Sequence, residues 1–118
     1  MSDYPTPCET AFQQLAEHDP DKLLQWIASD ELRPEDLTFA AEACKKIADQ
    51  TAVRNLLLPL LHHPSPVVRE GALYGLFADR DPATRLRVIE VARSDRSPGV
   101  RDAADEWLRL SAKGRRLP

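Results

Sequence analysis

The chain has few cysteines and no long apolar run, and each of these absences removes a class of protein. Its 118 residues include only two cysteines, Cys8 and Cys44, too few for a disulfide scaffold or a cysteine zinc site. No apolar run approaches the ~20 residues that a membrane-spanning helix needs. The first residues show neither the basic region nor the apolar stretch of a secretory signal. We therefore expect a cytoplasmic protein with free thiols and no membrane partner.

The motifs of common catalytic and metal sites are also lacking. There is no glycine-rich phosphate loop and no Gly-x-Ser-x-Gly sequence. His62 and His63 are adjacent rather than four residues apart, so on a helix their side chains point apart. Cys44 follows Ala40 on an apolar stripe, which predicts a buried and unreactive thiol. We expect no catalytic residue, no metal and no cofactor, and therefore no enzyme.

Charge is balanced over the chain but differs between its halves. The 16 basic and 19 acidic side chains give a net charge of −3, which disfavours a nucleic-acid-binding protein of general basic character. Residues 1–59 hold 5 basic and 11 acidic side chains, whereas residues 60–118 hold 11 and 8. Nucleic-acid or phosphate-group binding by the arginine-rich C-terminal half therefore stays an alternative. An ordinary mixed surface with a basic tail is favoured, because acidic residues are interleaved. Of the 16 basic residues 12 are arginine, a skew that favours a bacterial source.

Proline marks where helices begin. Proline fits the first turn of a helix, where its missing N–H is not needed. Several of the ten prolines directly follow a residue whose side chain caps helices well. These capping pairs are Asp19-Pro20, Ser65-Pro66, Asp81-Pro82 and Ser97-Pro98, and Thr6 with Glu9 forms a capping box. The pairs, together with Pro34, predict helices that begin near residues 7, 20, 34, 66, 82 and 98, with one more helix over 52–62.

The segments between these starts have the apolar spacing of helices. Val68, Ala72 and Leu76 recur at every fourth position, and Val100, Ala104 and Leu108 repeat the same stripe. No segment alternates polar and apolar residues for long enough to predict a strand. The sequence therefore predicts an all-α fold whose short loops place consecutive helices side by side.

An internal repeat of 32 residues underlies this pattern. Pro34, Pro66 and Pro98 are spaced by that interval, and Pro82 lies midway between the last two. At this offset the segment 65–70 (Ser-Pro-Val-Val-Arg-Glu) aligns with 97–102 (Ser-Pro-Gly-Val-Arg-Asp). A period of this length built from two helices is typical of helical repeat proteins.

Residues 55–78 resemble a HEAT repeat. The matching features are an apolar first helix with the internal Pro59, a short turn, and then Pro-x-Val-Arg-x-x-Ala-x-x-x-Leu. Residues 82–108 look like a second copy and 20–48 like a degenerate one, so the resemblance covers about 20–112. It implies a short right-handed α-solenoid of about three helix pairs that serves as an interaction scaffold. One departure is His62-His63, where the family often has an aspartate; Asp95 does lie in the last turn.

The chain then divides as a single repeat domain over 1–118. It comprises a capping helix at 6–18, repeats at 20–48, 52–78 and 82–112, and a basic tail at 113–118. Phe12 and Leu15 are expected to point inward from the capping helix. Gly71 and Gly75 lie beside a buried stripe, which predicts close approach of a neighbouring backbone. Arg69 and Arg101 occupy equivalent positions. The resemblance implies a bond to a turn carboxylate, and a basic ladder for an acidic partner is the alternative.

The second helix of each pair would line the concave face, as the resemblance implies. Its outward columns are Thr38/Glu70/Asp102, Glu42/Tyr74/Glu106 and Lys45/Phe77/Arg109. An aromatic residue amid charge is a sensible binding hot spot, although Tyr74 could also merely cover the core and Phe77 could pack on the next helix. We expect Trp107 to be half exposed and to mark a partner surface or a dimer contact. The candidate partner-binding residues are Glu42, Glu70, Tyr74, Asp102, Glu106 and Arg109.

These patterns predict a small non-enzymatic adaptor that binds another protein. We expect a monomer or a weak homodimer, with nucleic acid disfavoured as a partner. One alternative is the nucleic-acid or phosphate binding described above. Another is an accessory role like that of lyase-type HEAT proteins, which act on a cofactor-bearing partner.

Overall fold

A computed structural model describes residues 6–115 of the chain and the side chains of residues 9–111. This part of the chain is all-α, as the sequence predicts, and it contains no strand. The α-helices are α1 (Thr6–His18), α2 (Pro20–Ala28), α3 (Pro34–Ala43), α4 (Gln50–Leu57), α5 (Pro66–Gly75), α6 (Pro82–Ser94) and α7 (Pro98–Arg115). Two short 3₁₀ helices follow α3 and α4: η1 (Cys44–Lys46) and η2 (Pro59–His62). The expected helix over 52–62 is thus two helices, because Pro59 lacks the N–H that an α-helix needs.

Proline opens five of the α-helices, and aspartate caps three. The side chain of Asp19 accepts a hydrogen bond from the Lys22 N–H, and that of Asp81 accepts one from the Ala83 N–H. Asp49, which the sequence did not single out, caps α4 through the Ala52 N–H. The side-chain oxygen of Ser97 accepts a hydrogen bond from the Val100 N–H at 3.4 Å. The predicted Thr6–Glu9 capping box lies outside the described side chains.

The predicted cap at Ser65 is wrong. Its side chain makes no capping hydrogen bond to α5. The backbone N–H of Ser65 instead donates to Nδ1 of His63 at 3.0 Å. The start of α5 is held by Arg69, whose Nη1 donates to the carbonyl oxygens of His63 and Pro64 at 2.7 and 3.2 Å. A long side chain inside the helix therefore ties down the turn that a short capping side chain would otherwise organise.

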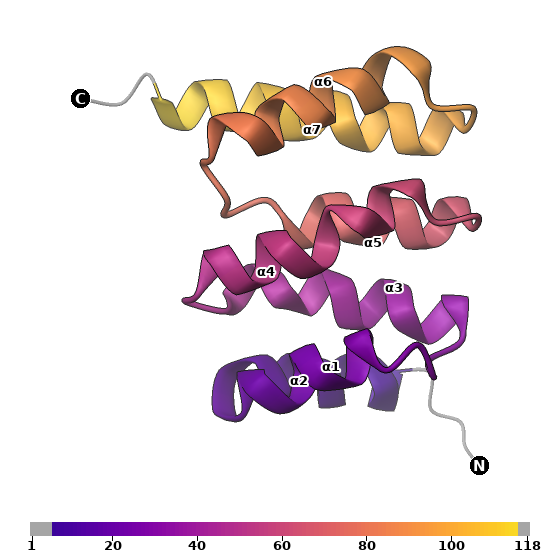
Figure 1. Cartoon of the computed structure of the whole chain (residues 1–118), viewed down its shortest axis with the longest axis vertical. Coiled ribbons are helices and arrows are strands. Elements are labelled where there is room, and N and C mark those ends of the chain that lie inside the picture. Colours follow the sequence, from indigo (N-terminus) through magenta and orange to yellow (C-terminus); the bar gives the residue numbers. More distant parts are fainter. Residues whose placement is uncertain (1–5, 116–118) are drawn as a thin grey trace.

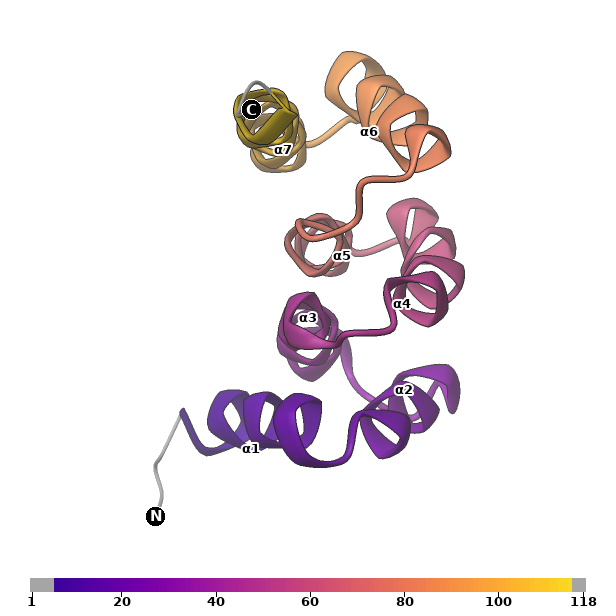
Figure 2. The same cartoon turned by 90° about the vertical axis from the view of Figure 1, so that its left-hand side faces the viewer.

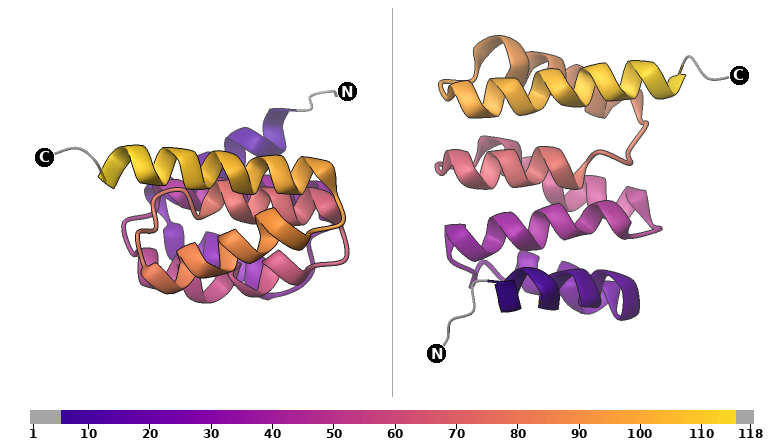
Figure 3. Two further views of the ribbon diagram at one scale, coloured as in Figure 1. Left: turned by 90° about the horizontal axis from the view of Figure 1, so that it is seen from above. Right: turned by 180° about the vertical axis from the view of Figure 1, so that it is seen from behind.

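The helices lie in two rows (Figures 1 and 2). One row holds α3, α5 and α7, with α1 lying across its lower end, and the other holds α2, α4 and α6. Within the first row α1 packs on α3, α3 on α5, and α5 on α7. Seen from behind, α3, α5 and α7 run side by side across one face of the molecule (Figure 3). We call this surface the α3–α5–α7 face. The described residues extend over 43 × 33 × 23 Å.

Gly71 and Gly75 let α3 and α5 meet closely, as predicted. A Cβ atom on Gly71 would lie 2.6 Å from the carbonyl oxygen of Thr38 and 2.8 Å from its Cα atom. A Cβ on Gly75 would collide with the carbonyl oxygen of Ala41 and lie 2.6 Å from Cδ1 of Leu57. One repeat later the matching positions are Ala103 and Trp107, so α5 and α7 are held further apart (Figure 2). The Thr38 hydroxyl adds a hydrogen bond to the Val67 carbonyl oxygen at 2.8 Å, joining α3 to the start of α5.

The core follows the apolar stripes that the sequence predicts. Ala40, Ala72 and Ala104, which are 32 residues apart, are all fully buried. Along the next column Cys44 and Leu76 are fully buried, and Leu108 is half-buried. These two columns of apolar residues therefore have similar burial in α3, α5 and α7, with Leu108 less covered than its counterparts.

The first helix closes one end of this core. Phe12 is buried, as expected, and its ring meets that of Trp26 edge-to-face with centroids 5.7 Å apart. Leu15 is half-buried and packs on the core. These contacts join α1 to α2 and to the core.

None of the helices in the described range is long and apolar enough to cross a membrane.

The expectation that Trp107 is half exposed is wrong. Its side chain is 2% exposed, and its indole Nε1 donates to the carbonyl oxygen of Leu76 at 3.0 Å. This carbonyl lies just past the end of α5, so it can accept the indole N–H. A tryptophan whose N–H has a partner can be buried whole. Trp107 therefore joins α7 to α5 and offers nothing to a partner. The last helix also continues to Arg115, beyond the expected end at residue 112.

Candidate interaction surface

The α3–α5–α7 face brings four of the six candidate residues together, with Tyr74 at the centre of the other three. Glu42 comes from α3, Glu70 and Tyr74 from α5, and Glu106 from α7. All four side chains are half-buried. Tyr74 is central because its helix is the middle one, and Glu70 precedes it by one helical turn. The 32-residue repeat places the other two carboxylates at the matching position on each neighbouring helix.

The electrostatic setting of Tyr74 reflects this arrangement. Burial of the phenol is the main cause that raises the pKa of Tyr74 above its ordinary value. The negative charges of Glu106, Glu70 and Glu42 raise it further, in that order. The hydroxyl thus stays protonated at neutral pH and lies where three carboxylates make the potential negative. An approaching cation would meet favourable charge and the face of an aromatic ring at one place.

Phe77 packs against the tyrosine ring. The two rings meet edge-to-face, with centroids 5.3 Å apart and planes at 83°. Phe77 is half-buried and packs against the core, in line with the expectation that it packs rather than binds. Tyr74 also packs on the core with part of its ring. The ring is therefore held in place while part of the Tyr74 side chain remains accessible to solvent.

Two of the carboxylates on this face also have a basic neighbour three residues further along the chain. Glu42 lies 3.7 Å from Nζ of Lys45, and Glu106 lies 3.9 Å from Arg109. Such loose pairs near solvent contribute little to stability, so a partner could replace either of them. Asp102 and Arg109 are exposed on α7, one turn to either side of Glu106. They mark the two ends of the charged strip on α7. Neither forms a hydrogen bond with Tyr74 in the described part of the chain.

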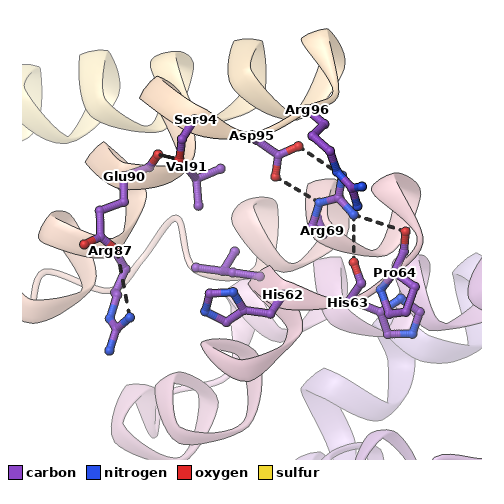
Figure 4. A pocket seen from close by; sticks show the side chains of 11 residues that line it. His62, His63, Pro64, Arg69, Arg87, Glu90, Val91, Ser94, Asp95 and Arg96 are labelled. Atoms are coloured by element: carbon purple, nitrogen blue, oxygen red, sulfur yellow. Dashed lines mark hydrogen bonds and ion pairs between the residues drawn. The ribbon is translucent and has the colours of Figure 1, made fainter.

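A polar cleft lies on another side of the molecule, between η2 and α6 (Figure 4). Its volume is about 310 Å³. Figure 4 shows His62 and Arg87 on one side of the cleft and Asp95 with Arg69 on the other. Arg96 also lines it, and Glu90 lies 3.9 Å from Arg87. His62 and His63 point apart, as the sequence predicts for adjacent residues, because Nδ1 of His63 is turned back to the Ser65 N–H.

Arg69 does bond to a turn carboxylate. Its Nε and Nη2 atoms donate to the two oxygens of Asp95 at 2.9 and 3.0 Å, and both side chains are 8% exposed. Burial opposes the charged form of Asp95, but the hydrogen bonds from Arg69 and from the Ser97 N–H outweigh it and hold its pKa below the usual value. All three nitrogen atoms of the Arg69 guanidinium thus donate hydrogen bonds within the molecule. The alternative of a ladder of free arginines for an acidic partner does not apply to this residue.

A second buried ion pair was not found from the sequence. Arg54 donates from Nε and Nη2 to the two oxygens of Asp79, each at 3.0 Å, and Asp79 is 1% exposed. The Thr84 hydroxyl donates to the same carboxylate at 2.5 Å. These bonds join α4 to the linker before α6. The only signal was the run Asp79-Arg80-Asp81-Pro82, which places a second aspartate beside a capping one.

The cysteines and the possible metal ligands are the remaining side chains that could carry chemistry. Cys44 is fully buried, as predicted, and burial raises the pKa of its thiol to about 12, so it stays protonated. Cys8 lies outside the described side chains. Within residues 9–111 no group of three or more histidine, cysteine, aspartate or glutamate side chains is placed to hold a metal ion.

Comparison of the chain with protein-family models, with curated proteins and with solved structures finds no match. Its function therefore has to be argued from the surfaces described above.

Proposed function

We propose that the chain is a small non-enzymatic adaptor that binds a segment of another protein along its α3–α5–α7 face. The observation that carries this proposal is Tyr74, an anchored ring surrounded by carboxylates from three different helices. Aromatic residues at the centre of a polar surface are the side chains that most often dominate binding energy. The fold that we infer is a short right-handed α-solenoid of HEAT-like helix pairs.

Three features support this fold assignment. Ala40, Ala72 and Ala104, which are 32 positions apart, are all fully buried. Glycines permit close approach of successive helices in one row. The Arg69–Asp95 pair ties one helix pair to the next, and its arginine recurs in the repeat as Arg101. In such a stack a row of second helices forms a continuous shallow surface suited to an extended segment.

The charge on this face selects the partner. Glu42, Glu70 and Glu106 surround the ring, and Asp102 extends the negative strip. A partner segment that carries lysine or arginine would match this surface, with one cationic side chain over Tyr74. Lys45 in η1 and Arg109 in α7 lie beside Glu42 and Glu106 and would limit how far a basic segment can extend.

Capture of partners from a lysate of the native host tests the proposal. The wild-type chain, Tyr74→Ala and Arg87→Ala would be immobilised in equal amounts, and bound proteins would be identified by mass spectrometry. Arg87 is the matched control because it is exposed and lies at the cleft rather than on the α3–α5–α7 face. We expect a protein retained by the wild type and Arg87→Ala but depleted by Tyr74→Ala.

The affinity of that protein would then be measured with the same three chains. We expect Tyr74→Ala to weaken binding by about 1–3 kcal/mol while thermal stability stays close to that of the wild type. Adding salt should weaken binding of the wild type, because the interaction pairs opposite charges. Equal affinity for Tyr74→Ala and the wild type would remove this face as the binding surface.

Binding of nucleic acid or phosphate groups is the second candidate function. It is favoured by the cleft between η2 and α6, where His62, Arg87 and Arg96 gather. If it is correct, duplex DNA or inorganic phosphate should bind at low salt, and Arg87→Ala should weaken binding where Tyr74→Ala does not. Affinity for DNA should fall steeply as salt is added. Absence of binding at low salt would remove this candidate.

A further inference from the structure

Some residues of α4 and α5 bind the next layer of helices, and the residues 32 positions later lie on the outer surface of α6 and α7. In the α4–α5 layer (residues 50–75, with the adjoining Leu76) three such residues reach the next layer. Arg54 binds Asp79, Arg69 binds Asp95, and the Leu76 carbonyl accepts the Trp107 indole N–H. The residues 32 positions further along are Leu86, Arg101 and Leu108. They belong to the α6–α7 layer (residues 82–115), which forms the upper end of the molecule in Figure 1.

These matching residues are left uncovered by the described part of the chain. Leu76 is fully buried, whereas Leu108 is only half-buried, and Leu86 is 64% exposed. Leu73 is fully buried, but its counterpart at the next repeat is the exposed Asp105. We call the surface formed by Leu86, Arg101, Asp105 and Leu108 the α6–α7 edge.

Arg101 is prepared for a carboxylate in the same way as Arg69. Its Nη1 donates to the Asp95 carbonyl oxygen at 2.6 Å, just as Nη1 of Arg69 donates to the His63 carbonyl oxygen at 2.7 Å. In Arg69 the remaining edge of the fork, Nε and Nη2, grips Asp95. In Arg101 the same two atoms have no hydrogen-bond partner within residues 9–111. The backbone bond therefore holds a guanidinium whose carboxylate-binding side is empty.

The edge also carries the matching charge. Asp105 lies one helical turn after Arg101 on α7, is exposed, and forms no ion pair with any described residue. Two copies of α7 laid antiparallel across a two-fold axis near residue 103 would pair each Arg101 with Asp105 of the other copy. A surface with both partners of an ion pair at this spacing is self-complementary. We propose that two copies of this chain associate through the α6–α7 edge, with reciprocal Arg101–Asp105 ion pairs at its centre.

This association is independent of the α3–α5–α7 face. Tyr74 and its carboxylates lie on the side of the helix row, so a dimer formed end to end leaves both copies of that surface accessible. The interface is small and charged, so it should be weak and sensitive to salt. Failure of the dimer would leave the proposed adaptor function untouched, and failure of the Tyr74 variants would leave the dimer untouched.

Charge reversal in sedimentation velocity experiments tests the proposal. The 118-residue chain would be examined from low micromolar to millimolar concentration, together with Arg101→Asp, Asp105→Arg and the double variant Arg101→Asp/Asp105→Arg. We expect the wild type to dimerise with rising concentration, and each single variant to dimerise at least about tenfold more weakly because like charges then face each other. The double variant should recover dimerisation, because both pairs are restored with their signs exchanged.

Asp102→Arg is the matched control, since Asp102 is an exposed acid on the same helix and lies on the α3–α5–α7 face. It should dimerise like the wild type. Circular dichroism would show that each variant keeps its helix content. A wild type that stays monomeric at every concentration would overturn the proposal. So would single variants that dimerise normally, or a double variant that fails to recover.

Discussion

The guanidinium of Arg69 grips the carboxylate of Asp95 with two parallel hydrogen bonds of 2.9 and 3.0 Å, across 26 residues of sequence. Arg69 lies in α5, and Asp95 lies in the turn between α6 and α7, so the pair joins one helix pair to the next. The same guanidinium ties down the turn before its own helix through the carbonyls of His63 and Pro64. One side chain thus sets both a local turn and the position of the following layer.

Breaking this pair should be costly. We predict that Arg69→Gln lowers the free energy of unfolding by about 3–5 kcal/mol, because Asp95 would be left charged and nearly buried without its partner. The matched control is Arg101→Gln at low protein concentration. Among the described side chains that residue makes only the backbone bond, so about 1 kcal/mol or less is expected. Urea denaturation followed by circular dichroism measures both. Equal losses for the two variants would contradict the role given to Asp95.

Stability should also fall in acid. The pKa values of Asp79 and Asp95 lie below those of ordinary aspartates, since hydrogen bonds from Arg54, Thr84 and Arg69 outweigh the effect of burial. A carboxyl whose pKa is lower in the folded state contributes stability above its unfolded value of about 3.9, and this is lost as pH falls through the folded value. We predict a decline in unfolding free energy from about pH 5 downward. In Asp95→Asn, whose neutral side chain does not titrate, the slope of this decline should be smaller; an unchanged slope would show that Asp95 does not contribute to it.

Glycines at two sites should respond differently to alanine. Gly75→Ala forces a methyl group against the Ala41 carbonyl oxygen and Leu57, both of which are part of the packed core. We predict a loss of about 1–3 kcal/mol, the usual cost of overpacking. At Gly99 the nearest atom to an added Cβ is Oε2 of Glu70, 2.7 Å away at the end of a flexible side chain. Gly99→Ala should therefore be neutral or slightly stabilising, because alanine favours the helix. Thermal unfolding of the two variants would distinguish these outcomes.

The setting of Tyr74 can be measured directly. The chain has two tyrosines, so the variant Tyr4→Phe leaves Tyr74 as the one phenol to titrate. We predict that its ultraviolet titration has a midpoint above the ordinary pKa of about 10. Adding Glu42→Gln and Glu106→Gln should lower that midpoint, because two of the three nearby negative charges are removed. A midpoint near 10 that the two substitutions leave in place would show that the carboxylates do not surround the ring.

The helices and their repeat could be predicted from the sequence because proline and the apolar stripes act locally. Pro20, Pro34, Pro66, Pro82 and Pro98 all stand at the first position of an observed helix. Local signals also implied the close approach at Gly71 and Gly75. They could not show which side of Trp107 faces α5, since its burial depends on a carbonyl 31 residues away. The Arg54–Asp79 pair was also missed, because its two residues are 25 positions apart. In addition, neither residue recurs at the 32-residue offset, so the repeat gave no signal.

The candidate surface shows the same division. Glu42, Tyr74 and Glu106 could be grouped from sequence because the repeat places them in one column. The polar cleft could not be predicted, because its two sides come from η2 and α6, which are separated in sequence by the whole of α5 and meet only through packing. Ser65 shows a further limit. A residue type suited to capping does not cap when the neighbouring turn is already held by Arg69.

Hydrogen-exchange mass spectrometry of the chain, alone and with the protein retained by Tyr74-dependent capture, tests the central claim most directly. The account predicts that binding slows exchange in residues 38–45, 70–77 and 102–109, which line the α3–α5–α7 face. Residues 62–64 and 87–96 around the polar cleft should exchange as they do in the free chain. Protection confined to the cleft, or spread equally over both regions, would contradict the claim that Tyr74 and its carboxylates form the binding surface.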